Sequence, residues 1–520
     1  MWFTFFCWMA VAIYCGVMIF LGFHTRVRSE KDEPKPNFEF WMAKRELPGW
    51  RLGTSLASGW LMLGWIGFGM SQIYLYGATG LWILPIPWFV LCFIILAMVP
   101  YVRRIRAVSL PQAMEKRYGK SARLIVALFS VYVFLSWTQA ELFVGGILMS
   151  SFLSVPPFVC MTILAATVGV YMWMGGFRAS VLTDITQFFL MAFFMIFLLA
   201  AAYMAAKSGS GGNILGKLAA STTVYGGAGN TLNLFVNGML FPVILMIGYL
   251  PGWMTEQDLL LRIQAAPTTR EAYKGAFTGF FLITVFVIAI PAVVALFAIA
   301  AFPPVNGMAP GAIGADAMNI IPSFISVLPA PVQVFMLVGI MGCQMSTVDT
   351  FANVAALPIS YDIVDPALRK RGASERMRLH SARVLSIIAI AASLFLALIS
   401  RRLGDVYYIS SGVLSASIAV PAIFLFWHRT TLPGVVAASV TGFAVTIGMY
   451  WFEMKHLGSA EMFPLFLKGS FGYIYVAAGV VASVAVIVPV SLLTAKPSPL
   501  QLMEVDSAPC DSMSEFDRIV

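Results

Sequence analysis

The stretch Ser58-Gly59-Trp60-Leu61-Met62-Leu63-Gly64-Trp65-Ile66-Gly67-Phe68-Gly69 lies inside an apolar run that is long enough to cross a membrane. Its four glycines weaken a helix, so we expect this membrane span to be interrupted. Glycines at such density also suit close packing between membrane helices, and this alternative stays open. A second interruption is expected at Gly248-Tyr249-Leu250-Pro251-Gly252-Trp253, where a proline and a glycine interrupt another apolar run.

The composition of the whole chain supports a membrane location. Of 520 residues, 60% are hydrophobic and 11% are charged, whereas a typical soluble domain has about 25% charged residues. This balance excludes a soluble globular fold and a disordered chain. The apolar runs are continuous, which favours an all-α polytopic membrane protein over a barrel. About thirteen transmembrane helices are expected, near 3–23, 52–76, 80–101, 122–152, 156–174, 180–206, 233–254, 273–301, 330–361, 381–400, 406–427, 431–453 and 470–494.

The distribution of positive charge predicts the orientation of the chain. The net charge of +9 arises from short clusters of Lys and Arg between apolar runs, so nucleic acid is not an expected partner. If the N-terminus lies outside, 27 of the 33 Lys and Arg residues fall on the inner side. We therefore expect an integral plasma-membrane protein, in a bacterial inner membrane, with the N-terminus outside and the C-terminus in the cytoplasm.

The ninth expected span carries oxygen ligands on one face. Cys343, Ser346, Thr347 and Thr350 share a helical face by their spacing, and Asp349 is a carboxylate at membrane depth. Sodium is a hard cation that prefers oxygen ligands. Hydroxyl groups facing the freed carbonyls of an interrupted helix would bind it, although such hydroxyls also bond to the carbonyl four residues earlier.

Other ionisable residues lie in or near the expected spans. Glu141 lies deep within the fourth span, where a carboxylate is costly unless it has a function. For Asp184, a salt bridge with Arg178 is the simplest explanation. A solvated helix end is expected for three residues that follow the seventh span: Glu256, Asp258 and Arg262.

Several short motifs resemble those of the sodium:solute symporter family. They occur in order through most of the chain, at Phe40–Pro48, Tyr76–Gly80, Leu110–Gly119, Gly175–Ala179, Thr183–Gln187, Met345–Thr350, Asp362–Ile363 and Phe426–Arg429. The resemblance implies a LeuT-like core of two inverted five-helix repeats with discontinuous helices. The repeats would be spans two to six and seven to eleven. The expected division is therefore 1–51, 52–206, 207–428, 429–495 and a flexible tail at 496–520.

The resemblance also implies a sodium site and a solute site. Carried over by position, the sodium ligands would be the carbonyls of Thr54, Ala57 and Cys343 and the hydroxyls of Ser346 and Thr347. Asp184 aligns with a motif aspartate that helps to bind or release sodium in some members, and Asp349 is a further ion-site candidate. The solute would lie at the midplane beside the two breaks, near Trp60, Trp137, Glu141, Tyr249 and Gly252.

We expect a sodium-coupled symporter that takes up a small organic solute by alternating access, with an amino acid or carboxylate as first choice. The first interrupted span looks most like the proline-transporting branch, but Leu56 stands where that branch carries aspartate. A membrane sensor and a sodium-independent facilitator or exchanger remain alternatives. No enzymatic activity and no organic cofactor are expected. The expected partners are sodium, the solute and lipid; one subunit would suffice for transport, and the sequence does not indicate the oligomeric state.

Overall fold

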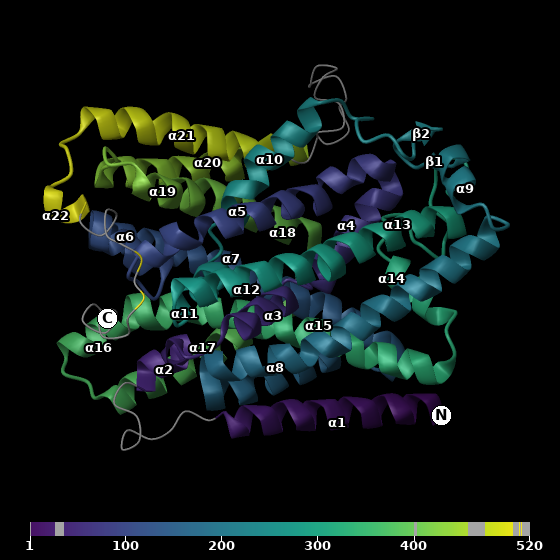
Figure 1. Cartoon of the computed structure of the whole chain (residues 1–520), viewed down its shortest axis with the longest axis horizontal. Coiled ribbons are helices and arrows are strands. Elements are labelled where there is room, and N and C mark those ends of the chain that lie inside the picture. The colour runs from purple at the N-terminus through teal and green to yellow at the C-terminus, as the bar shows by residue number, and fades with distance from the viewer. Residues whose placement is uncertain are drawn as a thin grey trace.

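The protein consists almost entirely of helices that run along a common direction (Figure 1). The computed structural model describes residues 2–25, 36–399, 403–455, 474–502, 509 and 511. The first half of the chain contains α1 (Trp2–His24), α2 (Pro36–Met42), α3 (Gly49–Gly59), α4 (Leu63–Tyr76), α5 (Pro85–Arg104), α6 (Leu110–Tyr118), α7 (Lys120–Leu153), α8 (Pro157–Gly209), α9 (Ile214–Ala220), α10 (Leu240–Trp253) and α11 (Gln257–Ala265).

The second half contains α12 (Thr269–Leu282), α13 (Ile290–Ala301), α14 (Ile320–Ser326), α15 (Ala330–Leu357), α16 (Asp365–Lys370), α17 (Glu375–Ile399), α18 (Leu403–Val413), α19 (Val420–Ile423), α20 (Leu432–Lys455), α21 (Ile474–Leu493) and α22 (Pro499–Leu502). Wider π-helical turns at Ile283–Ala289, Pro358–Val364 and Leu414–Ala419 and tighter 3-10 turns at Ala43–Arg45, Gly77–Trp82 and Phe424–Phe426 join some of them. Two short strands, β1 (Thr222–Thr223) and β2 (Gly227–Ala228), pair antiparallel, with Thr222 opposite Ala228.

Ten helical stretches of the described chain are long and apolar enough to cross a membrane. Large apolar side chains such as Phe89, Phe193 and Phe277 are exposed on the outside of the bundle, where a bilayer would cover them. The count of thirteen spans remains a prediction. To reach thirteen, α3 and α4 are counted together as one span, α10 and α11 are counted together as another, and α8 is counted as two.

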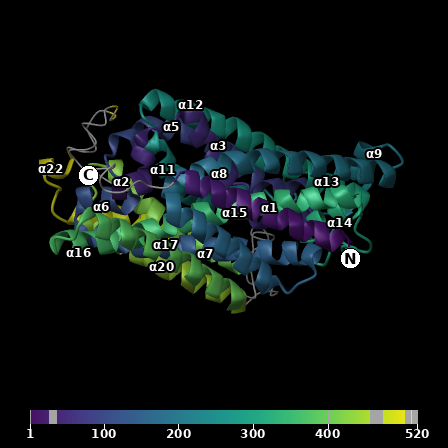
Figure 2. The ribbon, with the colours of Figure 1, turned by 90° about the horizontal axis from the view of Figure 1, so that it is seen from below.

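The bundle has two distinct ends. Helices α6, α16 and α22 lie at one end, and α9 and α14 lie at the other (Figures 1 and 2). We call these the α6 end and the α9 end. Helix α1 begins at the α9 end and packs along α8 (Figure 2). The start of α1 and the last helix, α22, therefore lie at opposite ends, as an odd number of crossings requires.

Both expected interruptions are present. Helix α3 ends at Gly59, and Trp60–Met62 separate it from α4. The second interruption lies at Met254–Glu256, just after the Pro251–Gly252 pair and not within it. Pro251 stays inside α10 because neighbouring hydroxyls satisfy the backbone there: Ser415 Oγ accepts from the Gly252 amide at 3.2 Å, and Thr255 Oγ1 donates to the Pro251 carbonyl at 3.1 Å.

The two interrupted helices run in opposite directions. Arg45, just before α3, donates through Nε to the carbonyl of Gln264 near the end of α11, at 2.8 Å. Trp82, which follows α4, donates through Nε1 to the carbonyl of Leu234, which precedes α10, at 3.1 Å. The start of one interrupted helix thus lies beside the end of the other, as in an inverted repeat.

Helix α8 reverses direction at Gly176. Its 53 residues would extend about 80 Å if straight, more than twice the thickness of a bilayer core. Gly176 has a φ of +54°, and a Cβ there would lie 2.5 Å from the carbonyl oxygen of Phe40. Only glycine fits this turn, so α8 contains the expected spans 156–174 and 180–206.

The connection between α1 and α3 packs partly into the bundle. It contains α2, whose Phe40 and Trp41 are fully buried. Residues 26–35 of this connection lie outside the described chain. The expected flexible tail includes the short helix α22, and Gln501 accepts from Arg117 Nη1 at 3.4 Å; residues 503–508, 510 and 512–520 lie outside the described chain.

A close backbone contact fixes α3 against α12. A Cβ added at Gly53 would lie 2.2 Å from the carbonyl oxygen of Gly275, so only glycine permits this approach. At Gly67 in α4, an added Cβ would meet no atom within 4 Å. The two glycines therefore form a matched pair for mutation.

We expect Gly53→Ala to destabilise the protein by about 1–3 kcal/mol, because the methyl group overpacks the α3–α12 contact. Gly67→Ala should be neutral or slightly stabilising, since alanine favours a helix. The midpoint of thermal unfolding in detergent tests both variants. Equal midpoints would show that the α3–α12 contact is not tight.

Candidate functional site

The interruption between α3 and α4 frees a backbone carbonyl. The Leu61 amide donates to the Ser58 carbonyl at 3.1 Å, whereas a continuous helix would direct it to Ala57. Across this break lies α15, where Ser346 Oγ is 2.8 Å from Ser58 Oγ. The freed carbonyl and the hydroxyl-bearing face of α15 therefore belong to neighbouring segments.

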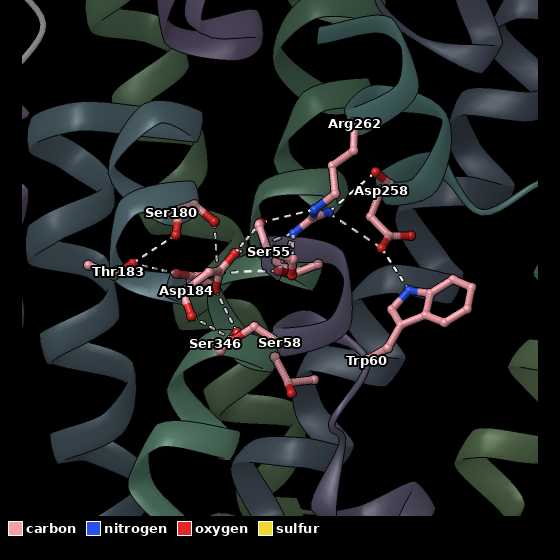
Figure 3. A network of polar contacts seen from close by, with 12 residues as sticks. Ser55, Ser58, Trp60, Ser180, Thr183, Asp184, Asp258, Arg262 and Ser346 are labelled. Carbon is pink, nitrogen blue, oxygen red and sulfur yellow. Dashed lines mark hydrogen bonds and ion pairs between the residues drawn. The ribbon is translucent and has the colours of Figure 1, made fainter. Parts of the chain in front are cut away.

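A buried polar network is centred on Asp184 of α8 (Figure 3). Ser55 Oγ donates to Oδ2 of Asp184, and Ser346 Oγ donates to Oδ1, both at 2.5 Å. Arg262 Nη2 lies 3.4 Å from the same carboxylate. Asp184 thus connects α3, α11 and α15 from its place on α8.

Arg262 of α11 is the cation of this network. Its Nε donates to Ser55 Oγ at 3.1 Å, and its Nη2 donates to Thr350 Oγ1 at 3.0 Å. Its Nη1 lies 3.5 Å from Oδ2 of Asp258, which also accepts from Trp60 Nε1 at 2.9 Å. The guanidinium therefore joins α3 and α11, one half of each interrupted helix, to α8 and α15, with little exposure to solvent.

Two expectations about charged residues were wrong. Asp184 does not pair with Arg178, which instead lies 2.9 Å from Glu46 and 3.6 Å from Glu39. The three residues expected at a solvated helix end are all buried: Glu256, Asp258 and Arg262. Helix α11 packs against α3, α5 and α15, which removes these side chains from solvent.

The sequence contained a signal for this network. Asp258 and Arg262 are four residues apart, which places them on one face of a helix. This pair directly follows an expected interruption within an apolar region. An acid–arginine pair directly after an interruption favours a buried contact with the other interrupted helix over a helix end that is exposed to solvent.

Asp349 turns toward α8. It accepts from Tyr171 Oη at 2.7 Å and from Ser180 Oγ at 2.9 Å. In their ionised forms the three buried aspartates, Asp184, Asp258 and Asp349, are opposed by one described guanidinium, that of Arg262. The network then has an excess of negative charge, which favours a bound cation.

The five candidate sodium ligands are all buried: Thr54, Ala57, Cys343, Ser346 and Thr347. Thr347 Oγ1 donates to the Cys343 carbonyl at 2.8 Å, and Ser346 donates to Asp184. Both hydroxyl groups therefore use their hydrogen within the protein and keep oxygen lone pairs for a cation. Thr54 Oγ1 donates to the Trp50 carbonyl at 2.9 Å.

Three of the candidate solute residues lie on the α4 and α10 sides of the two breaks. The buried carboxylate of Glu141 accepts from the Tyr407 hydroxyl and, at 3.3 Å, from the amide of Gly64 near the start of α4. Tyr249 stacks on Trp253 with ring centroids 5.2 Å apart. Gly252 contacts Ser415 through its amide.

The two candidate tryptophans have other contacts. Trp60 belongs to the polar network through Asp258. Trp137 Nε1 donates to Ser410 Oγ at 2.8 Å, and its ring packs edge-on against Phe351 at 5.1 Å. Both side chains therefore have structural contacts, Trp60 in the polar network and Trp137 in helix packing. Their role in solute binding stays a prediction.

A model described as the sodium:solute symporter family matches residues 40–442. The chain belongs to this family. It is 25% identical over 461 residues to the sodium/glucose cotransporter of Vibrio parahaemolyticus, which covers 83% of this chain and 82% of that relative. It is also 25% identical over 437 residues to the sodium/proline symporter of Escherichia coli (strain K12), with 81% and 83% covered.

Solved structures agree on the fold. A Na⁺-coupled sialic acid symporter superposes with a TM-score of 0.71 at 16% identity, over 95% of this chain and 99% of that one. Mhp1, a nucleobase-cation-symport-1 family transporter, superposes with a TM-score of 0.51 at 12% identity, over 89% and 97%. The fold is LeuT-like. The protein is therefore a membrane symporter that couples the transport of sodium to that of a small organic solute. It is a transporter and not an enzyme.

We expect Arg262→Met to destabilise the protein by about 3–5 kcal/mol, because it leaves buried carboxylates without their cation. The double variant Asp184→Asn/Arg262→Met should lose less than the sum of the single variants. Thermal unfolding in detergent measures all three.

Lys274→Met is the matched control, since Lys274 pairs with Glu271 at 2.5 Å while more than half exposed. Its cost should stay below about 1 kcal/mol. If Arg262→Met behaves like this control, the buried network does not hold the four helices together.

Proposed function

We propose that the transported sodium binds between α3 and α15. The ligands are the carbonyls of Thr54, Ala57 and Cys343 and the hydroxyls of Ser346 and Thr347. One observation carries this proposal: the Ala57 carbonyl lacks its helical donor at the place where α3 meets the hydroxyl face of α15. Sodium supplies the missing partner and offsets part of the negative charge of Asp184 and Asp349.

Sodium binding is coupled to closure of the α6 end. The ion draws α3 toward α15, and the Arg262 network lies next to this contact and joins the same helices to α8 and α11. An ion that stabilises one arrangement of these helices raises the affinity for solute in that arrangement, and the solute raises the affinity for sodium equally. A membrane potential of about 100 mV adds about 2.3 kcal/mol per sodium ion.

The α6 end faces the cytoplasm in this proposal. Arginines and lysines gather there on α5, α6 and α16, among them Arg103, Arg104, Lys116, Arg117 and Lys370. This distribution follows the positive-inside rule. The N-terminus is then outside and the C-terminus inside, in a bacterial inner membrane.

We expect Ser346→Ala/Thr347→Ala to raise the half-saturating sodium concentration for uptake about tenfold or more, since two oxygen ligands are lost. Uptake into proteoliposomes across a range of sodium concentrations tests this. Ser483→Ala is the control: Ser483 is a buried serine of α21 that bonds to the Ala438 carbonyl, outside the two repeats. Unchanged sodium dependence in the double variant would exclude this site.

Replacement of sodium by potassium should abolish concentrative uptake, because potassium is a larger cation than the one for which the five oxygen ligands are proposed. The same experiment separates symport from the sodium-independent facilitator or exchanger. A protein of either kind would continue to move solute at the same rate in potassium.

A further inference from the structure

Glu141 of α7 lies beside the first interruption. Its carboxylate lies at the start of α4, where Gly64 leaves room for it: an added Cβ at Gly64 would lie 2.9 Å from Oε1 of Glu141 and 2.6 Å from the Tyr407 hydroxyl. The partial positive charge of a helix start is a common place for the carboxylate of a solute. In this protein, a side chain of α7 takes that place.

The charge of Glu141 is not balanced by a neighbouring cation. The groups that face its carboxylate in the described chain are uncharged: the Tyr407 hydroxyl, the backbone amides of Gly64 and Trp65, and the Gln344 side chain. Its side chain is fully buried. An ionised carboxylate at this depth is costly without a positive partner, and the helix start offsets only part of its charge.

A cluster of five aromatic rings adjoins this position through Tyr407, whose hydroxyl donates to Glu141, and through Trp65. Trp65, the residue after Gly64, lies 5.1 Å from the ring of Tyr407 and 6.2 Å from Trp253. Tyr249 stacks on Trp253 and lies 6.1 Å from Tyr408. These five rings come from α4, α10 and α18, the helices that meet at the outer sides of the two interruptions. Electron-rich ring faces beside a carboxylate suit a cationic nitrogen.

We propose that Glu141, with the rings of Trp65 and Tyr407, binds the positively charged nitrogen of an amine solute. This inference rests on the proposed function and specifies its solute. The nitrogen forms an ion pair with Glu141 and contacts the ring faces. A solute carboxylate is repelled at this position, because it would meet a like charge in a medium of low polarity. Of the two solute classes expected first from the sequence, an amino acid fits this position through its amino group, whereas a simple carboxylate does not.

Two other roles of Glu141 predict different behaviour. If it only capped α4, glutamine would replace it without loss, since an amide oxygen also accepts a hydrogen bond. If a proton balanced its charge, glutamine would imitate the protonated form and solute binding would persist. An amine-binding role requires the negative charge itself.

Thermal unfolding of the full chain in detergent with sodium tests the proposal. The probes are ethanolamine and choline, each compared with the soluble uncharged alcohol that has carbon in place of nitrogen, propanol and dimethylbutanol respectively, and butyrate is the anionic probe. At least one amine should stabilise the protein at a concentration about tenfold or more below that of its analogue, and butyrate should not. No preference for any amine would overturn the proposal.

The variants are Glu141→Gln and Glu141→Asp. The first should abolish the preference for the amine over its analogue, and the second should weaken it while keeping the charge. If Glu141→Gln does not fold, the probe series on the wild-type chain decides: equal stabilisation by every amine and its uncharged analogue overturns the proposal. Sodium stabilisation of the wild-type chain is measured separately; its absence would refute the sodium site, whereas its presence without an amine response would refute only this inference.

Discussion

Backbone polar groups cannot remain unpaired inside a bilayer, and this constraint shapes the whole protein. Two helices stop within the membrane region, and side chains from other helices supply the partners. Ser415 of the π-helical segment after α18 accepts from the Gly252 amide of α10, just before the α10–α11 break, and Glu141 of α7 accepts from the Gly64 amide at the start of α4. The carbonyl of Ala57 is the group for which we propose a sodium ion as the partner.

The two proposed sites differ in their electrostatics because their surroundings differ. Around Asp184, a guanidinium and several hydroxyls hold the charges in a fixed arrangement that spans four helices. Around Glu141, hydrogen bonds orient the carboxylate but no described cation neutralises it. The first arrangement suits a closure that forms and breaks as a unit. The second suits a site whose positive charge arrives with the solute.

The sequence predicted the secondary structure well where one local pattern decided the outcome. Continuous apolar runs located the spans, and glycine or proline within them located the interruptions to within a few residues. The prediction from sequence failed where contacts between distant segments decide which charged side chains pair. Arg178 is close to Asp184 in sequence, but the turn at Gly176 brings it to Glu46 instead. Arg262, 78 residues away from Asp184, reaches that carboxylate because α11 packs against α3.

The sequence alone determined the membrane class and the family and indicated candidate oxygen ligands for sodium, because composition, order of motifs and helical spacing are local properties. Only the tertiary structure decided which charges are paired. Burial of Asp258 and Arg262, the partner of Asp184 and the place of Glu141 at the start of α4 all depend on how the two repeats pack. Electrostatic energies in a medium of low polarity depend strongly on distance. The sequence of a single helix does not determine its distance from another helix.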